Sequence, residues 1–143
     1  MSYLSHPHNG ITLMELMVVI VIIGVLASIA YPSYQSSVMK THRTEGTTAL
    51  LDLQNRMERF FRDRNSYIGA HIGGIADGSQ LLASSATENN WYQIQISAQA
   101  VTTFTIQAVP QGSQVNDTIC ATFAIQSDGT RSVTGSGNAQ DCW

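Results

Sequence analysis

Charged residues are scarce in this chain. Only 12% of its 143 residues are Asp, Glu, Lys or Arg, about half the usual share of roughly 25%. The formal net charge of −3 excludes a protein whose whole surface is built for nucleic acid. The length excludes a multidomain enzyme. Disorder is also excluded for the bulk of the chain, because 43% of the residues are hydrophobic.

Catalytic motifs are lacking as well. The sequence holds no G-x-S-x-G, no H-E-x-x-H and no glycine-rich phosphate loop. Its two cysteines form no C-x-x-C motif. His42 and His71 lie far apart in the sequence and are expected to be exposed, isolated side chains. We therefore expect no enzyme, no metal and no cofactor.

The few charges divide the chain into parts. Residues 1–10 contain no Lys, Arg, Asp or Glu, and residues 32–64 carry a balance of +2. Residues 65–143 carry a balance of −4, with 31 Ser, Thr, Asn and Gln against six charges. Together with the apolar run between them, these blocks divide the chain into residues 1–10, 11–31, 32–64 and 65–143.

Residues 11–31 are apolar with one exception, Glu15. A helix of this length reaches about 31 Å, which matches the hydrocarbon core of a bilayer at roughly 30 Å. Two other interpretations stay open. A buried soluble helix fits poorly because no face is polar, and a cleaved secretory signal fits poorly because no positive segment precedes the run.

The apolar residues between 33 and 64 recur at steps of three and four, which predicts an amphipathic helix. Pro32 is expected to kink this long element rather than end it. The joined helix would cover 54 residues and about 80 Å, so a membrane or other subunits must cover its apolar half. Its core-facing stripe would contain Leu50, Leu53, Met57, Phe60 and Phe61.

Beyond residue 64 the pattern alternates between apolar and polar residues, which predicts half-buried strands. The fold class is therefore α+β, with one long N-terminal helix packed on a small antiparallel sheet of three or four strands. The expected strands are 92–97, 104–108, 119–126 and a short last one near 130–134, with a loop at 69–78, a turn at 110–113 and a hairpin at Asp128-Gly129.

The two cysteines, Cys120 and Cys142, allow a single pairing. In an exported chain a disulfide is the natural interpretation, and it would stabilise the fold by roughly 3 kcal/mol in the chain-entropy model. The alternative is two free buried thiols.

The segment GITLMELMVVI at residues 10–20 combines a glycine, a carboxylate at a fixed offset and an uninterrupted apolar run. It resembles the class III signal of type IV pilins and pseudopilins, and the resemblance continues over about the first 60 residues. It implies that residues 1–10 are a prepilin leader, cleaved by prepilin peptidase after Gly10, with Ile11 as the methylated new N-terminus and Glu15 as the fifth residue of the mature chain.

Glu15 carries a physical argument of its own. A carboxylate inside an apolar segment costs about 2.5 to 3.5 kcal/mol on insertion scales, so it needs an interface or a cationic partner. We hypothesise that Glu15 pairs with the free amine at Ile11 of a neighbouring subunit during assembly. The alternative is a snorkelling carboxylate without a partner.

Gly24 and Pro32 bracket a weak stretch of helix. The resemblance implies that pilins lose helicity there in assembled filaments. Gly and Pro are also common in membrane helices, so a purely structural role is equally open.

The C-terminal segment, with Cys120, Asp128-Gly129 and Cys142, resembles the disulfide-bounded end of PilE-type minor pilins. The resemblance implies a type IV pilus subunit, a minor pilin contributing to assembly or initiation, for adhesion, twitching motility or DNA uptake. Its partners would be other pilin subunits, prepilin peptidase and the bacterial inner membrane before assembly, and its final place the extracellular filament. The runner-up is a type II secretion pseudopilin.

A DNA-binding receptor subunit of the pilus is the second class of function. Four arginines in residues 56–64 would meet phosphates, but interspersed acidic residues favour an ordinary solvated helix face. Nucleic acid therefore stays a possible partner that the sequence does not favour. The arginines are Arg56, Arg59, Arg62 and Arg64, and the acids are Asp52, Glu58 and Asp63.

Overall fold

The computed structural model describes residues 11–74 and 77–143. The chain divides into two compact units, one ending at Ser37 and one covering Val38–Trp143. A single helix, α1, runs over Leu13–Arg64 and continues through Pro32. The expectation of one joined helix is thus confirmed.

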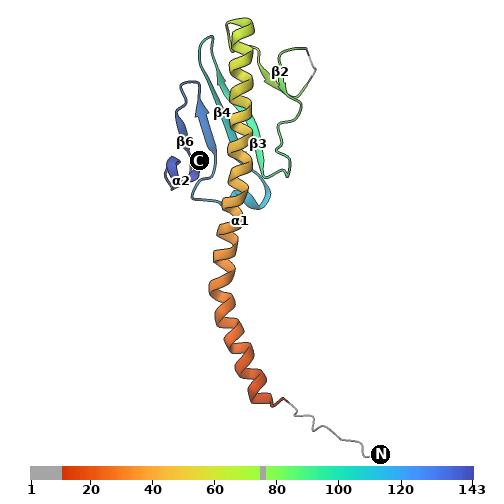
Figure 1. The fold of residues 1–143 in the computed structure, drawn as a ribbon, viewed down its shortest axis with the longest axis vertical. Coiled ribbons are helices and arrows are strands. Elements are labelled where there is room, and N and C mark those ends of the chain that lie inside the picture. The colour runs from red at the N-terminus through yellow and green to blue at the C-terminus, as the bar shows by residue number, and fades with distance from the viewer. Residues whose placement is uncertain (1–10, 75–76) are drawn as a thin grey trace, which may run out of the picture. The chain divides into compact units, whose positions relative to one another are not determined.

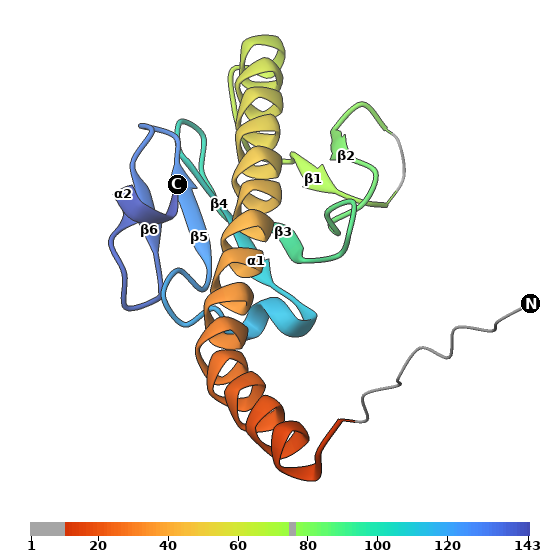
Figure 2. The same ribbon diagram turned by 60° about the horizontal axis from the view of Figure 1, so that its bottom comes forward.

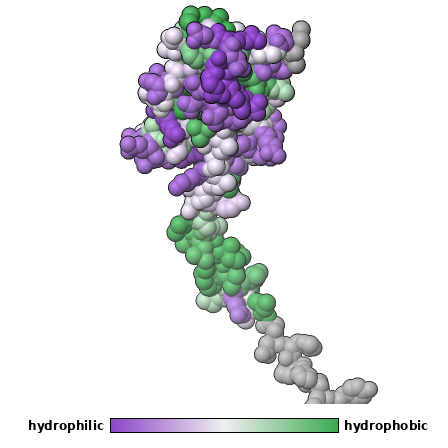
Figure 3. All heavy atoms as spheres, turned by 45° about the horizontal axis from the view of Figure 1, so that its top comes forward, coloured by the Kyte–Doolittle hydropathy of each residue, from purple (hydrophilic) through white to green (hydrophobic). Residues whose placement is uncertain are grey.

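The first unit contains the apolar part of α1, whose side chains are all exposed. Figure 3 shows them as a green surface at the N-terminal end of the helix. In the part of the chain that the structure describes, α1 is the one helix long and apolar enough to cross a membrane. Within the described residues none of these side chains is buried, unlike those of the core helix of a soluble protein.

The second unit is built on a four-stranded antiparallel sheet in the order β3-β4-β5-β6. A separate parallel pair, β1 and β2, lies on one side of α1, whereas β5, β6 and the short helix α2 lie on the other (Figures 1 and 2). The elements are β1 His71–Ile72, β2 Gln80–Leu82, β3 Tyr92–Gln99, β4 Phe104–Pro110, the 3-10 helix η1 Gly112–Asn116, β5 Phe123–Gln126, β6 Arg131–Val133 and α2 Ala139–Cys142.

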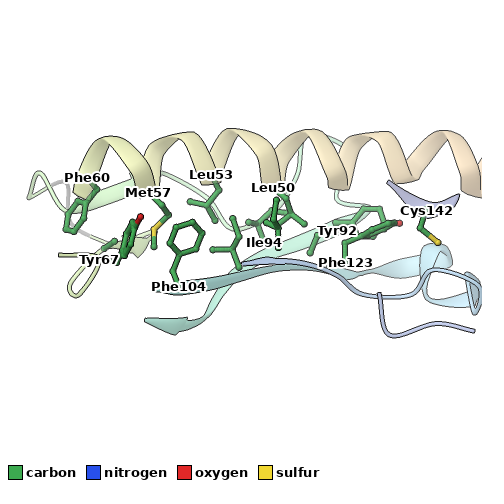
Figure 4. Close-up of a cluster of buried hydrophobic side chains, with 14 of the residues drawn as sticks. Leu50, Leu53, Met57, Phe60, Tyr67, Tyr92, Ile94, Phe104, Phe123 and Cys142 are labelled. Carbon is green, nitrogen blue, oxygen red and sulfur yellow. The ribbon is translucent and has the colours of Figure 1, made fainter. Parts of the chain in front are cut away.

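The core lies between the last turns of α1 and the inner face of the sheet (Figure 4). The expected stripe is buried at Leu50, Leu53, Met57 and Phe60, with Phe61 partly buried beside it. On the sheet side the buried residues alternate as expected, so that β3 turns Tyr92 and Ile94 inward while Gln93 and Gln95 face solvent. Helix and sheet approach so closely at Gly46 that a side chain there would press on the Tyr92 ring. The α+β class is confirmed, with four strands in the main sheet.

One expected strand begins later than the pattern predicts. Residues 119–122 do not belong to β5, which starts at Phe123. Ala121 has a φ of +51°, and Ile119 is half exposed. This segment instead bonds to the chain after β6, where a Cβ on Gly135 would collide with the carbonyl of Ile119. Close backbone approach, rather than side-chain alternation, decides the structure here.

The expected loop at 69–78 is also partly wrong, because it contains strand β1. Two residues are too few to show a periodic pattern. β1 is held by main-chain bonds to the β2 side, from His71 N–H to the Ser79 carbonyl and from Gly73 N–H to the Leu82 carbonyl.

Candidate functional site

The first candidate region is the N-terminus of α1. Thr12 Oγ1 accepts a hydrogen bond from Glu15 N–H at 3.1 Å, so Thr12 caps the helix and Glu15 lies in its first turn. A carboxylate in the first turn is favoured by the positive end of the helix dipole. Ile11 is exposed, and the expected cleavage position Gly10 lies outside the described residues.

Gly24 and Pro32, the expected flexible positions, both lie within continuous helix. A side chain at Gly24 would meet no atom within 4 Å. Gly24 therefore presents open backbone on the surface of α1, where another helix can approach closely.

A buried polar cluster fixes the start of the second unit. Arg43 donates two hydrogen bonds to the carboxylate of Asp117, at 2.7 and 2.8 Å. The Asp117 side chain is 1% exposed and that of Arg43 13%. This bidentate pair ties α1 to the chain after η1, and leaving either charge without the other would be costly.

Gln114 lies at the centre of this cluster and is fully buried. Its amide nitrogen carries two protons and lies 2.9 to 3.2 Å from three acceptors, the Met39 carbonyl, the Tyr92 hydroxyl and the Asp117 carboxylate. Its amide oxygen can only accept, so the 3.1 Å contact with His42 Nδ1 requires a proton on that nitrogen. Burial raises the pKa of Tyr92 to about 12.

The expectation that His42 and His71 are exposed singletons is wrong. The His42 ring stacks on Trp91 with ring centres 4.0 Å apart, and His71 Nε2 lies 3.8 Å from an Asp77 oxygen. Both rings are half buried. Sequence separation hides such partners, because Trp91 lies 49 residues beyond His42 in the chain. Within residues 11–74 and 77–143, no cluster of three or more His, Cys, Asp or Glu could hold a metal ion.

The arginines near the end of α1 differ in their contacts and exposure. Arg56 donates to Asp52 at 2.8 Å and to the Leu81 carbonyl at 3.0 Å. Arg64 donates to the Gly78 carbonyl at 3.2 Å and lies over the Phe60 ring. By contrast, Arg59 and Arg62 are exposed, and no hydrogen bond or ion pair to another described residue holds either of them.

Two hollows flank the β1-β2 pair. The arginine groove, of about 270 Å³, lies between α1 and the β2 segment and is lined by Arg56, Arg59, Phe60, Asp63, Gly78, Gln80 and Leu81. The glutamine cleft, of about 330 Å³, lies between β1 and the edge of β3. The cleft is lined by Ala70, His71, Ile72, Ser85, Gln93, Ile94, Gln95, Ile96 and Gln99.

The predicted disulfide joins Cys120 and Cys142, with Cα atoms 5.7 Å apart. It holds α2 against the loop after η1. Trp143 then packs edge-on against Phe123, and Arg131 lies over the Trp143 ring at 4.9 Å. Two free thiols are therefore not the state of this chain.

A family model described as "Type IV minor pilin ComP, DNA uptake sequence receptor" matches residues 32–124. The chain belongs to this family of type IV minor pilins. A second model, the prokaryotic N-terminal methylation motif, matches residues 6–31. As a minor pilin, the chain is a subunit that assembles with other pilins, and the resemblance seen in the sequence is confirmed.

Among solved structures, the minor pilin is similar to the non-core minor pilin PilV of Neisseria meningitidis. The TM-score is 0.52 at 22% identity, covering 70% of this chain and 90% of that chain. This likeness concerns the fold alone. None of the curated proteins compared with the chain matches it.

Proposed function

We propose that this minor pilin waits in the inner membrane as a precursor and enters a pilus after cleavage behind Gly10. The methylation motif supports this processing, and the fully exposed apolar part of α1 supports storage in a bilayer. In the filament, Glu15 would pair with the amine of Ile11 on a neighbouring subunit. Packing against other pilin helices would then replace the lipid.

We further propose that the assembled subunit binds DNA through the arginines of α1. The observation that carries this proposal is that Arg59 and Arg62 are exposed and engaged by no described residue. Two of the acidic residues beside them have partners of their own. Asp52 binds Arg56, and Glu58 accepts a hydrogen bond from the Tyr67 hydroxyl. The family description, a receptor for a DNA uptake sequence, supports the same partner.

Phosphate is the ligand that these groups suit. A guanidinium presents several N–H donors to phosphate oxygens, and neutralising phosphates releases counterions, which makes binding weaken steeply with salt. Because the chain carries a net charge of −3, such binding must come from a local surface rather than from the whole molecule.

DNA binding is tested on the full-length subunit in detergent by titrating duplex DNA at several salt concentrations. We expect affinity to fall as salt rises, and Arg59→Ala and Arg62→Ala each to lower the salt slope by about 1. Arg131→Ala is the matched control, because Arg131 lies at the opposite edge of the main sheet and stacks on Trp143. Undetectable binding of the wild-type subunit at low salt would remove the proposal.

A further inference from the structure

A receptor for a DNA sequence needs groups that read bases. Contacts from arginine to phosphate position a protein on DNA but carry no sequence information. Base edges are read by neutral donors and acceptors, and the glutamine amide matches the N6 and N7 atoms of adenine. Uncharged amides without a partner in the chain would supply this recognition. The inference that follows rests on the DNA-binding function proposed above.

The glutamine cleft supplies such groups. Gln93 and Gln95 line it from β3, both side chains are exposed, and no hydrogen bond to another described residue engages either amide. The residues lining the cleft include no Asp, Glu, Lys or Arg. A neutral lining of this kind suits an uncharged heterocycle better than a phosphate.

The backbone of β3 adds to the cleft. Ile94 N–H donates to the Ser85 carbonyl at 2.6 Å, on the side away from β4. Alternate residues of an antiparallel strand turn their main-chain groups to the same edge, so the main-chain groups of Ile96 also face the cleft. Just beyond, Gln99 Nε2 donates to the Ala70 carbonyl at 2.6 Å and closes this end. The walls are therefore held by hydrogen bonds.

The cleft and the arginine groove share one supporting element. β1 contributes His71 and Ile72 to the cleft, whereas β2 contributes Gln80 and Leu81 to the groove. β1 and β2 are paired with each other (Figure 2). The arginine groove and the glutamine cleft thus flank one strand pair, and the proposal requires one stretch of DNA to contact both.

We propose that the glutamine cleft is the base-reading site of this minor pilin, with Gln93 and Gln95 recognising base edges while Arg59 holds the neighbouring phosphates. The arginines and the glutamines have different roles in this proposal. The arginines supply affinity for any DNA, and the two amides discriminate between bases.

The test uses the full-length subunit in detergent and a pool of duplexes that carry a random 20-base-pair segment between constant ends. Bound duplexes are recovered and sequenced over several rounds. We expect the wild-type subunit to enrich a motif. Gln93→Ala and Gln95→Ala should each relax at least one position of that motif, lowering the ratio of affinities for motif and scrambled duplex about tenfold, with the salt slope unchanged.

Gln126→Ala is the matched control, because Gln126 is an exposed glutamine on β5, away from the cleft. It should keep both the motif and the affinity ratio. Thermal unfolding of each variant checks that the fold is intact.

The proposal is overturned if the cleft variants keep the wild-type motif and ratio, or if the wild-type subunit binds DNA but enriches no motif. Both results leave DNA binding by the arginines standing. If the wild-type subunit binds no duplex at low salt, the proposed function itself falls. The two failures are therefore distinguishable.

Discussion

Gln114 shows how much a single uncharged residue decides in this protein. Its amide faces one carbonyl, one hydroxyl, one carboxylate and one imidazole, and it is fully buried. A buried amide with hydrogen-bond partners for both its nitrogen and its oxygen favours one arrangement of its neighbours. Gln114 thereby fixes the position of η1 against α1, next to the Arg43–Asp117 pair.

At this scale we predict the effect of Asp117→Asn. The substitution keeps the shape but removes the charge that Arg43 binds with two hydrogen bonds, leaving a largely buried guanidinium without a counter-ion. We expect the free energy of unfolding to fall by about 3 kcal/mol, measured by urea denaturation. Asp141→Asn, at an exposed position, should change it little. Equal midpoints for both variants would contradict the role assigned to the pair.

At the scale of elements, α1 combines two different surfaces in one helix. Beyond residue 45 its apolar residues recur at helical spacing, and Leu50, Leu53, Met57 and Phe60 are buried against the sheet. Before residue 35 the apolar residues occur on every face, and none of the described ones is buried. A helix that is apolar all round needs an apolar environment, and no other described residue covers this part of α1.

The helix leads to a prediction about Glu15→Gln. This substitution removes the negative charge that the proposed pairing with the Ile11 amine needs. A hydrogen bond to a charged group contributes about 1.5–3 kcal/mol. We expect incorporation into sheared pili to fall about tenfold or more, measured by quantitative immunoblot against the membrane fraction. Glu88→Gln, at an exposed site in the second unit, serves as the control. Wild-type incorporation of the Glu15 variant would exclude the pairing.

On the scale of the whole second unit, one covalent bond closes the C-terminal region. The Cys120–Cys142 disulfide spans 22 residues of sequence, and this stretch includes β5 and β6. β6 has only three residues and pairs on one side with β5. A short edge strand gains little from the ladder alone, so the disulfide and the packing of Trp143 on Phe123 hold this edge in place.

We therefore predict that replacing both cysteines by serine lowers the free energy of unfolding by about 3 kcal/mol. Hydrogen exchange should rise first in β6 and α2, while β3 and β4 keep their protection. Urea denaturation with exchange mass spectrometry measures both effects. An unchanged midpoint, or uniform loss of protection across the sheet, would show that the bond does not act locally on this edge.

Much of the fold could be predicted from the sequence because the signals are local. The buried stripe with Leu50 and Leu53 follows from the helical repeat, and the inward turn of Tyr92 and Ile94 follows from alternation along a strand. The type IV pilin family followed from the segment at residues 10–20. The assembly roles of Ile11 and Glu15 stay predictions.

Only the tertiary structure decided the rest. Arg43 and Asp117 are 74 residues apart in the chain, and nothing in their local patterns distinguishes them from solvated charges. Local patterns likewise do not predict the His42–Trp91 stack, strand β1 or the late start of β5. The glutamine cleft exists because β1 lies beside β3. Local sequence sets the period of each element, whereas partners distant in sequence meet only when the packed chain brings their elements side by side.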